Sequence, residues 1–202
     1  MALWLAAEPL LLASQSKVRR ALLVAAGIPV DVLAADLDER SIEAAASSSE
    51  PSAIAALLAR EKALAVGRGH PERLVLGADQ VLALNGKRFA KPPDRAAALA
   101  QLRALSGRVH ALHAAVTCVQ GGAVIFEHVS VARLTMRTLS DQFLDAYLDA
   151  AGHAVTQSVG AYQLEGLGSQ LFERIEGDYF AILGLPLLEV QDFLRRRGSL
   201  LA

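Results

Sequence analysis

Apolar residues recur along this chain in two patterns, as short continuous runs and as longer segments with helical spacing. The short runs predict a buried strand at residues 10–13 and further strands at residues 29–35 and 74–78, the last of them stopping at Asp79. The helical spacing predicts helices at residues 17–26, from Pro51 to a glycine stop at Gly67, and from a cap at Asp94 to residue 105. An acidic loop, "DLDER" at residues 36–40, separates the second strand from the second helix.

The second half of the chain begins with a long apolar stretch that Gly121 and Gly122 divide in two. It predicts two long antiparallel strands, and the earlier pair Asn85-Gly86 predicts a tight hairpin. Further on, the pattern predicts a helix capped by Ser140 or Asp141, short strands in the glycine-rich residues 160–186, and a last helix opened by Pro186. Together these elements favour an α/β fold with a central mixed sheet flanked by helices, as one domain over residues 1–202.

Composition narrows the classes of protein that this chain can belong to. Hydrophobic residues make up 53% of its 202 residues, which excludes an intrinsically disordered chain. The net charge of -1 gives no general electrostatic reason to expect binding to nucleic acid or to a membrane. Cys118 is the single cysteine, so there is no disulfide framework, and no uncharged run reaches transmembrane length. We therefore expect a cytoplasmic protein.

A basic cluster follows the first strand, at a position where positive charge is unexpected. Ser14 and Ser16 lie in the turn, and Lys17, Arg19 and Arg20 lie in the first turns of the helix. The helix macrodipole is positive at this end and disfavours cations there. A polyanion held between the backbone N–H groups and these side chains would offset that repulsion. A solvated basic face is the alternative, and the local pattern leaves both open.

Carboxylates follow two of the predicted strands, and a basic cluster is available beside them. Asp36, Asp38 and Glu39 come after the second strand, and Asp79 comes directly after the third. Ligands of α/β proteins gather beyond the carboxyl ends of strands, so these positions favour metal-assisted phosphoryl chemistry with Mg²⁺. The alternative is that Asp38 and Asp79 are turn residues.

Other side chains with catalytic potential give weaker signals. Lys91 is either a turn lysine or a phosphate ligand. Lys62 is either a solvated lysine on the surface of its helix or a second phosphate ligand. The five histidines have no spacing typical of zinc, and the sequence contains no P-loop motif.

The ordered motifs of the chain together resemble the Maf family of nucleoside triphosphate pyrophosphatases. The resemblance rests on "LLLASQSKVRRALLVAAGIP", "DLDE", "AREKA", "VLGADQV", "KPPDRAAALAQLRALSG", "SVGAYQLEGLG" and "FERIEGDYFAILGLPL". It implies an inosine-triphosphatase-like fold with two lobes around a cleft. It also implies hydrolysis of a nucleoside triphosphate between the α and β phosphates, with Mg²⁺ or Mn²⁺ as cofactor. A homodimer is expected from the resemblance alone.

The resemblance assigns roles to six residues of this sequence. It implies catalytic roles for Asp79, Glu39 and Lys91, with Asp79 orienting or deprotonating the attacking water. It implies that Ser14, Arg19 and Lys62 contact the substrate's phosphates, and that Glu39 and Asp79 hold the metal.

Base specificity is expected from Val18, Gln80 and Glu165, where the chain departs from the commonest family pattern. Gln80 and Glu165 match the family branch that acts on 7-methyl-GTP. A carboxylate can accept hydrogen bonds from guanine N1–H and N2–H₂, and its charge favours a cationic base. Against this, Val18 lacks the aromatic face that tryptophan would offer a cationic ring, so weaker affinity or a broader preference is expected. The resemblance still favours 7-methyl-GTP.

Three alternatives to this interpretation stay open. The enzyme could instead prefer dTTP or UTP within the same family. It could be a nucleotide-binding regulator of cell division without catalysis. As an alternative to the base assignment itself, Glu165 could face solvent while Gln80 packs in a turn.

Overall fold

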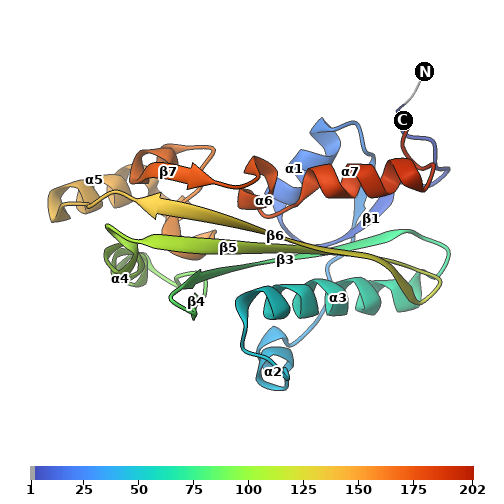
Figure 1. Cartoon of the computed structure of the whole chain (residues 1–202), viewed down its shortest axis with the longest axis horizontal. Helices are drawn as coiled ribbons and strands as arrows, with labels where there is room; N and C mark the ends of the chain where they lie inside the picture. The colour runs from blue at the N-terminus through green and yellow to red at the C-terminus, as the bar shows by residue number, and fades with distance from the viewer. Residues whose placement is uncertain (1–2) are drawn as a thin grey trace.

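The computed structural model describes residues 3–202 and contains a mixed sheet with helices on both faces (Figure 1). The strands are β1 (Leu10–Ala13), β2 (Val30–Val32), β3 (Val75–Leu84), β4 (Lys87–Phe89), β5 (Val109–Gln120), β6 (Ala123–Met136) and β7 (Phe172–Glu176). They are ordered β2-β1-β3-β5-β6-β7, with β4 paired to β3. β1 is parallel to both of its neighbours, and the remaining pairs are antiparallel. The predicted α/β class with a mixed sheet is confirmed.

Six of the seven α-helices in residues 3–202 begin at polar residues whose side chains accept hydrogen bonds from the backbone of the first turn, and the last helix follows Pro186 without such a cap. The seven are α1 (Lys17–Ala25), α2 (Glu39–Ala44), α3 (Pro51–Gly69), α4 (Arg95–Leu105), α5 (Asp141–Ala151), α6 (Tyr179–Ile182) and α7 (Leu187–Arg196). The capping side chains are those of Ser16, Asp38, Glu50, Asp94, Ser140 and Asp178. Within residues 3–202, no helix combines the length and apolar character that a membrane crossing requires.

The two faces of β3 pack against different helices. Leu76 and Ala78 belong to a buried cluster with α1 and α7, whereas Val75 and Val81 pack in clusters with α3. Figure 1 shows α3 along one face of the long strands and α1 and α7 on the other. Because side chains alternate along a strand, Asp79 lies on the α3 side.

One edge of β3 is left without a neighbouring strand over four residues. On this edge β1 pairs with β3 only as far as Gly77, and β4 pairs with it only from Leu82 onward. On the other edge β5 pairs with β3 continuously, from Val75 to Ala83. Among the described strands, residues 78–81 therefore border a gap in the sheet, which we call the sheet opening.

Three of the predicted element boundaries are wrong. The strand predicted at residues 29–35 covers only Val30–Val32. The third strand does not stop at Asp79 but continues to Leu84, because β5 pairs with it as far as Ala83. The helix from Pro51 does not stop before Gly67 but runs to Gly69. A Cβ at Gly67 would lie 3.0 Å from Val119 Cγ1, so this glycine serves close packing against β5 and does not end the helix.

Two other segments also differ from the prediction. The "DLDER" segment is not only a loop, since Asp38 caps the short helix α2. The glycine-rich residues 160–186 do not form several short strands: they carry the end of the 3₁₀ helix η2 (Val159–Ala161), the 3₁₀ helix η3 (Leu167–Leu171), the single strand β7 and the short helix α6. A further 3₁₀ helix, η1 (Gly152–Thr156), precedes them. The Asn85-Gly86 hairpin, the long β5–β6 hairpin and the helix after Pro186 are confirmed.

The buried pair His110 and Tyr162 makes the stability of the fold sensitive to acid. His110 Nε2 lies 2.7 Å from the Tyr162 hydroxyl, and burial lowers the pKa of His110 to about 4. Between about pH 6.5 and pH 4 the unfolded chain binds a proton at this residue while the folded chain does not. Stability is therefore lost as the pH falls through this window.

We expect His110→Gln to reduce this acid sensitivity, because glutamine can hydrogen-bond without titrating. The part of the stability loss between pH 6.5 and pH 4 that depends on His110 is expected to be about 2–3 kcal/mol. Urea unfolding at a series of pH values measures it. Parallel pH profiles for the wild type and the variant would show that His110 does not contribute.

Candidate active site

A cleft of ≈ 1400 Å³ lies at the sheet opening. Its walls come from the turn after β1, from α3, from the segment after β4, and from residues 157–165 and 182–184. The nine residues to which the resemblance assigns a role line it: Ser14, Val18, Arg19, Glu39, Lys62, Asp79, Gln80, Lys91 and Glu165. Residues from both halves of the chain are thus brought to one place.

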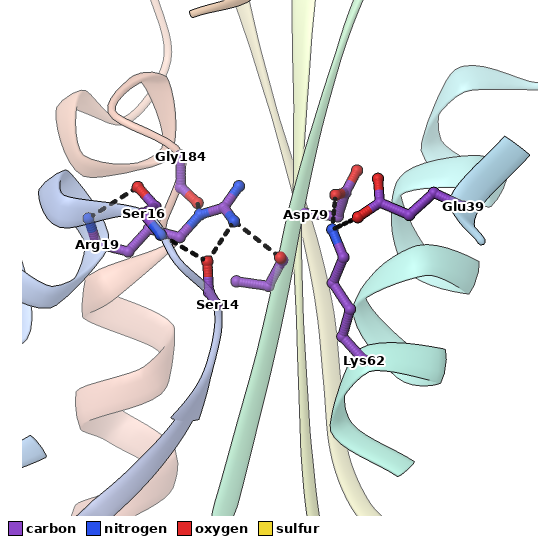
Figure 2. Close-up of polar contacts among 8 residues, drawn as sticks. Ser14, Ser16, Arg19, Glu39, Lys62, Asp79 and Gly184 are labelled. Atoms are coloured by element: carbon purple, nitrogen blue, oxygen red, sulfur yellow. Dashed lines mark hydrogen bonds and ion pairs between the residues drawn. The ribbon is translucent and has the colours of Figure 1, made fainter. Parts of the chain in front are cut away.

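An ionic group of one lysine and two carboxylates lies on the α3 side of the cleft. Lys62 Nζ is 2.6 Å from Asp79 Oδ1 and 2.9 Å from Glu39 Oε1 (Figure 2). The side chains of Lys62 and Asp79 are only 13% and 11% exposed, whereas that of Glu39 is 47% exposed. Lys62 is therefore no solvated helix lysine, and Asp79 lies within a strand and not in a turn.

A close approach of β3 to α3 positions this ionic group. A Cβ at Gly77 would lie 2.1 Å from the carbonyl oxygen of Ala59 and 2.8 Å from the nitrogen of Ala63. Only glycine allows the strand and helix backbones to come so near. Because Lys62 precedes Ala63 and Asp79 follows Gly77 by two residues on the same face, this contact brings the two charges together.

The basic cluster at the start of α1 is divided between buried and exposed side chains. Arg19 Nε donates to the Gly184 carbonyl at 2.8 Å, and Nη1 donates to Ser14 Oγ at 3.0 Å and to the Ala78 carbonyl at 2.9 Å. Lys17 and Arg20 are exposed. Figure 2 shows Arg19 and Ser14 on the opposite side of β3 from Lys62.

The hydrogen-bond partners of Arg19 explain why a cation is tolerated at the N-terminus of α1. Carbonyl oxygens from two other segments and a serine hydroxyl compensate its charge, so it is not part of a purely solvated face. Burial lowers the pKa of the Arg19 guanidinium, and the negative charges of Asp79 and Glu39 oppose that shift. Its Nη2 atom has no hydrogen-bond partner among residues 3–202 and remains able to contact a ligand in the cleft.

Arg19→Ala is expected to raise KM and to lower kcat, because a phosphate contact is made in the ground state and strengthens as charge grows in the transition state. The variant also loses the link from α1 to β3, which we expect to cost about 1.5–3 kcal/mol of stability. Steady-state kinetics and urea unfolding measure the two effects. Arg20→Ala is the matched control, since Arg20 is the exposed neighbour. An unchanged KM would limit Arg19 to a structural role.

The residues expected to recognise the base, Val18, Gln80 and Glu165, line the same cleft. Gln80 Nε2 donates to the carbonyls of Ala181 and Ile182 at 3.0 and 2.9 Å, which leaves the amide oxygen as its free polar atom. Gln80 thus packs against α6 from within a strand, not in a turn. Glu165 and Lys91 are exposed, and neither side chain has a hydrogen-bond partner within the described chain. Val18 is half-buried.

Sequence reasoning missed one ion pair in the cleft wall. Glu43 Oε2 on α2 lies 2.8 Å from Arg88 Nη1 on β4. No local pattern pointed to this pair, since its members are far apart in sequence. It links α2, which carries Glu39, to the hairpin strand that leads to Lys91. Asp38 does not line the cleft; it caps α2, and hydrogen bonds from Ser41 lower its pKa.

The residues present suit a hard divalent cation. Among residues 3–202, no three His, Cys, Asp or Glu side chains group together as a metal site. Glu39 and Asp79, however, already direct one oxygen each at a single cation, the Lys62 ammonium. Mg²⁺ is commonly bound by one or two carboxylates together with substrate phosphates and water, so two carboxylates are enough.

The amino-acid sequence of the chain is similar to those of known proteins. A family model described as "Maf-like protein" matches residues 9–197, nearly the whole chain. The chain belongs to this Maf-like family. A protein of Rhodopseudomonas palustris (strain HaA2) named "Nucleoside triphosphate pyrophosphatase" is 58% identical over 200 residues, covering 99% of each chain. A protein of the same name from Bradyrhizobium diazoefficiens is 58% identical over 195 residues, covering 96% of each.

A solved structure is also similar to this Maf-like chain, at lower identity. It is described as a HAM1 protein from Coxiella burnetii, with 16% sequence identity and a TM-score of 0.42. The match covers 81% of this chain and 91% of that one.

Proposed function

We propose that the protein hydrolyses nucleoside triphosphates between the α and β phosphates, giving a monophosphate and pyrophosphate. As a Maf-like protein whose full-length relatives carry the name nucleoside triphosphate pyrophosphatase, the chain is a hydrolase of this class. The observation that carries the proposal is the placement of Asp79 beside Lys62 in a cleft that Arg19 and Lys91 also line.

Asp79 is the group that activates water in this proposal. Its Oδ1 atom accepts a hydrogen bond from Lys62 Nζ, and its Oδ2 atom has no hydrogen-bond partner among residues 3–202. Oδ2 accepts a proton from the water as the water oxygen bonds to the α-phosphorus. The bond from that phosphorus to the bridging oxygen breaks, and pyrophosphate leaves with the bonding electron pair.

Cationic side chains around the cleft stabilise the triphosphate and the leaving pyrophosphate. Arg19 offers Nη2 from the α1 side, and Lys91 offers an exposed ammonium from the segment after β4. Ser14 Oγ helps to hold Arg19 in place at 3.0 Å. Fixed cations of this kind lower the barrier because they are directed at charge that grows in the transition state.

A divalent cation, Mg²⁺ or Mn²⁺, belongs to the proposal, with Glu39 and Asp79 as its protein ligands. Two convergent carboxylate oxygens support this assignment. When bound, the cation supplies charge neutralisation to the phosphate oxygens.

A pyrophosphate-release assay over a panel of nucleoside triphosphates, with Mg²⁺ or Mn²⁺, tests the proposed activity. We expect release from at least one modified or non-standard nucleotide. No turnover of any triphosphate would contradict the proposal. Tight nucleotide binding without turnover would favour the alternative of a regulatory protein, against which the intact group of Asp79, Lys62 and Glu39 argues.

For the base, we infer a preference for guanine-type nucleotides such as 7-methyl-GTP. Glu165 and Gln80 line the same cleft, and each has an oxygen without a hydrogen-bond partner among the described residues. Guanine N1–H and N2–H₂ are donors that two acceptor oxygens can satisfy. Uracil and thymine present a single N3–H between two carbonyl oxygens, which a carboxylate satisfies less well.

Glu165→Gln is expected to shift the preference toward UTP or dTTP, because an amide both donates and accepts. The ratio of kcat/KM for 7-methyl-GTP to that for UTP measures the shift, and it should fall about tenfold or more for the loss of a charged hydrogen bond. Glu173→Gln, an exposed substitution on β7, is the control. An unchanged ratio, or a wild type that prefers dTTP and UTP, would overturn the assignment.

Three wider features complete the proposal. The chain acts as one domain, which is supported by a cleft lined by residues from Ala13 to Gly184. It works in the cytoplasm, where nucleoside triphosphates are made and used. It forms a homodimer, an expectation by family resemblance that light scattering coupled to gel filtration can check.

A further inference from the structure

The Lys62 ammonium lies where the proposed divalent cation would bind. Its Nζ atom contacts one oxygen of Asp79 at 2.6 Å and one oxygen of Glu39 at 2.9 Å (Figure 2). These are the two carboxylates assigned to the metal. The same two oxygens cannot direct their charge at an ammonium and at a metal ion together without placing two cations in contact.

We propose that Lys62 is an internal counter-ion that competes with the divalent cation for Glu39 and Asp79. In the protein without nucleotide, the lysine neutralises the carboxylates and keeps metal affinity low. The cation binds only when Lys62 withdraws, and the phosphates of an incoming nucleotide then give the ammonium a new anionic partner. The inference rests on the proposed function, because it takes the metal and the nucleotide from there.

The surrounding packing determines which part of the site can move. The base of the Lys62 side chain is fixed, because α3 is held against Gly77 of β3. The ammonium is carried on a flexible four-carbon stem, and its hydrogen bonds and ion pairs in the described chain go only to the two carboxylates. Its head can therefore leave while its helix stays in place.

The other buried cation of the cleft lacks this freedom. Arg19 is held by two backbone carbonyls and by Ser14, so its guanidinium stays on its side of β3. Glu39 lies on the short helix α2 and is half-exposed, so it can follow a change of partner. Of these cations, Lys62 alone is held only by side chains that a metal also needs.

Removal of the lysine would leave Asp79 as a buried charge without a partner, since its residue is only 8% exposed. A buried charge without compensation destabilises the fold. A divalent cation bound in the place of the ammonium restores the compensation. Loss of Lys62 is therefore expected to lower stability and to raise metal affinity together, a combination that a purely structural role does not produce.

The test titrates Mn²⁺ into the full-length protein without nucleotide, followed by electron paramagnetic resonance or calorimetry. We expect Lys62→Met to bind Mn²⁺ at least tenfold more tightly than the wild type. Lys87→Met, on the exposed hairpin strand β4, is the matched control and should bind like the wild type. Thermal melts should show a larger Mn²⁺-dependent rise of Tm in Lys62→Met than in the wild type.

Lys62→Gln, which keeps a polar head without the charge, serves as the second variant if the methionine variant does not fold. It should also bind Mn²⁺ more tightly. Equal or weaker Mn²⁺ binding by the folded variant, or no Mn²⁺ binding by any variant, would overturn the inference. Because the titration uses no nucleotide, its failure is distinct from a failure of the proposed hydrolysis, which the pyrophosphate assay reports on the wild type.

Discussion

Asp79→Asn is expected to lower kcat by about 10³-fold, in line with the loss of a general base. The change is nearly isosteric, and the amide oxygen can still accept the hydrogen bond that Lys62 donates to Oδ1. The amide nitrogen, however, cannot take a proton from water. Folding and nucleotide binding should remain close to those of the wild type. Single-turnover kinetics, circular dichroism and equilibrium nucleotide binding measure the three effects.

Asp38→Asn is the matched control for this variant. Asp38 is close in sequence to Glu39, and asparagine can replace it as the cap of α2. Because Asp38 does not line the cleft, kcat should stay within about twofold of the wild type. A near wild-type kcat for Asp79→Asn would show that Asp79 does not act as the base.

Gly77→Ala is expected to damage both the fold and the site. The new methyl group would lie 2.1 Å from the Ala59 carbonyl oxygen, so α3 and β3 must move apart. Such overpacking costs about 3 kcal/mol, which corresponds to a fall in Tm of roughly 10 °C for a chain of this size. The shift also separates Lys62 from Asp79, so kcat/KM should fall even at temperatures where the variant is folded.

Gly69→Ala is the control, because a Cβ at the end of α3 meets nothing within 4 Å. It should leave Tm and activity unchanged. Calorimetry and steady-state kinetics at a temperature well below both transitions separate the two effects. Wild-type stability in Gly77→Ala would mean that the close approach of β3 to α3 is not what positions the ionic group.

The parts of the fold that depend on local chemistry could be predicted from the sequence. Asp94 and Ser140 cap helices because their side chains reach the backbone of the following turn. Asn85 and Gly86 form the hairpin because both adopt positive φ, as that turn requires. Each of these features needs only a few neighbouring residues.

Features that depend on distant residues could not be predicted. A charged residue after an apolar run indicated a strand end at Asp79, but Lys62 compensates that charge from a different element. Lys62 itself looked like a surface lysine, because its helix pattern does not reveal the approach of β3. The side-chain amide of Gln80 donates hydrogen bonds to backbone carbonyls about a hundred positions away.

In the candidate site, too, the local features could be predicted from the sequence and the contacts between distant residues could not. The residue types were available from the motifs, but their grouping depends on the sheet opening, where β1 has ended and β4 has not begun. Through this gap Arg19 reaches the Ala78 carbonyl from one side while Asp79 faces α3 on the other. Sequence order alone does not show that the two charged groups share one cleft.

Hydrolysis of 7-methyl-GTP in ¹⁸O-labelled water, with the products analysed by mass spectrometry, tests the central claim most directly. If water activated at Asp79 attacks the α-phosphorus, the products are the monophosphate and pyrophosphate, and the label is found in the monophosphate alone. Label in pyrophosphate, or release of a diphosphate and inorganic phosphate, would contradict the account.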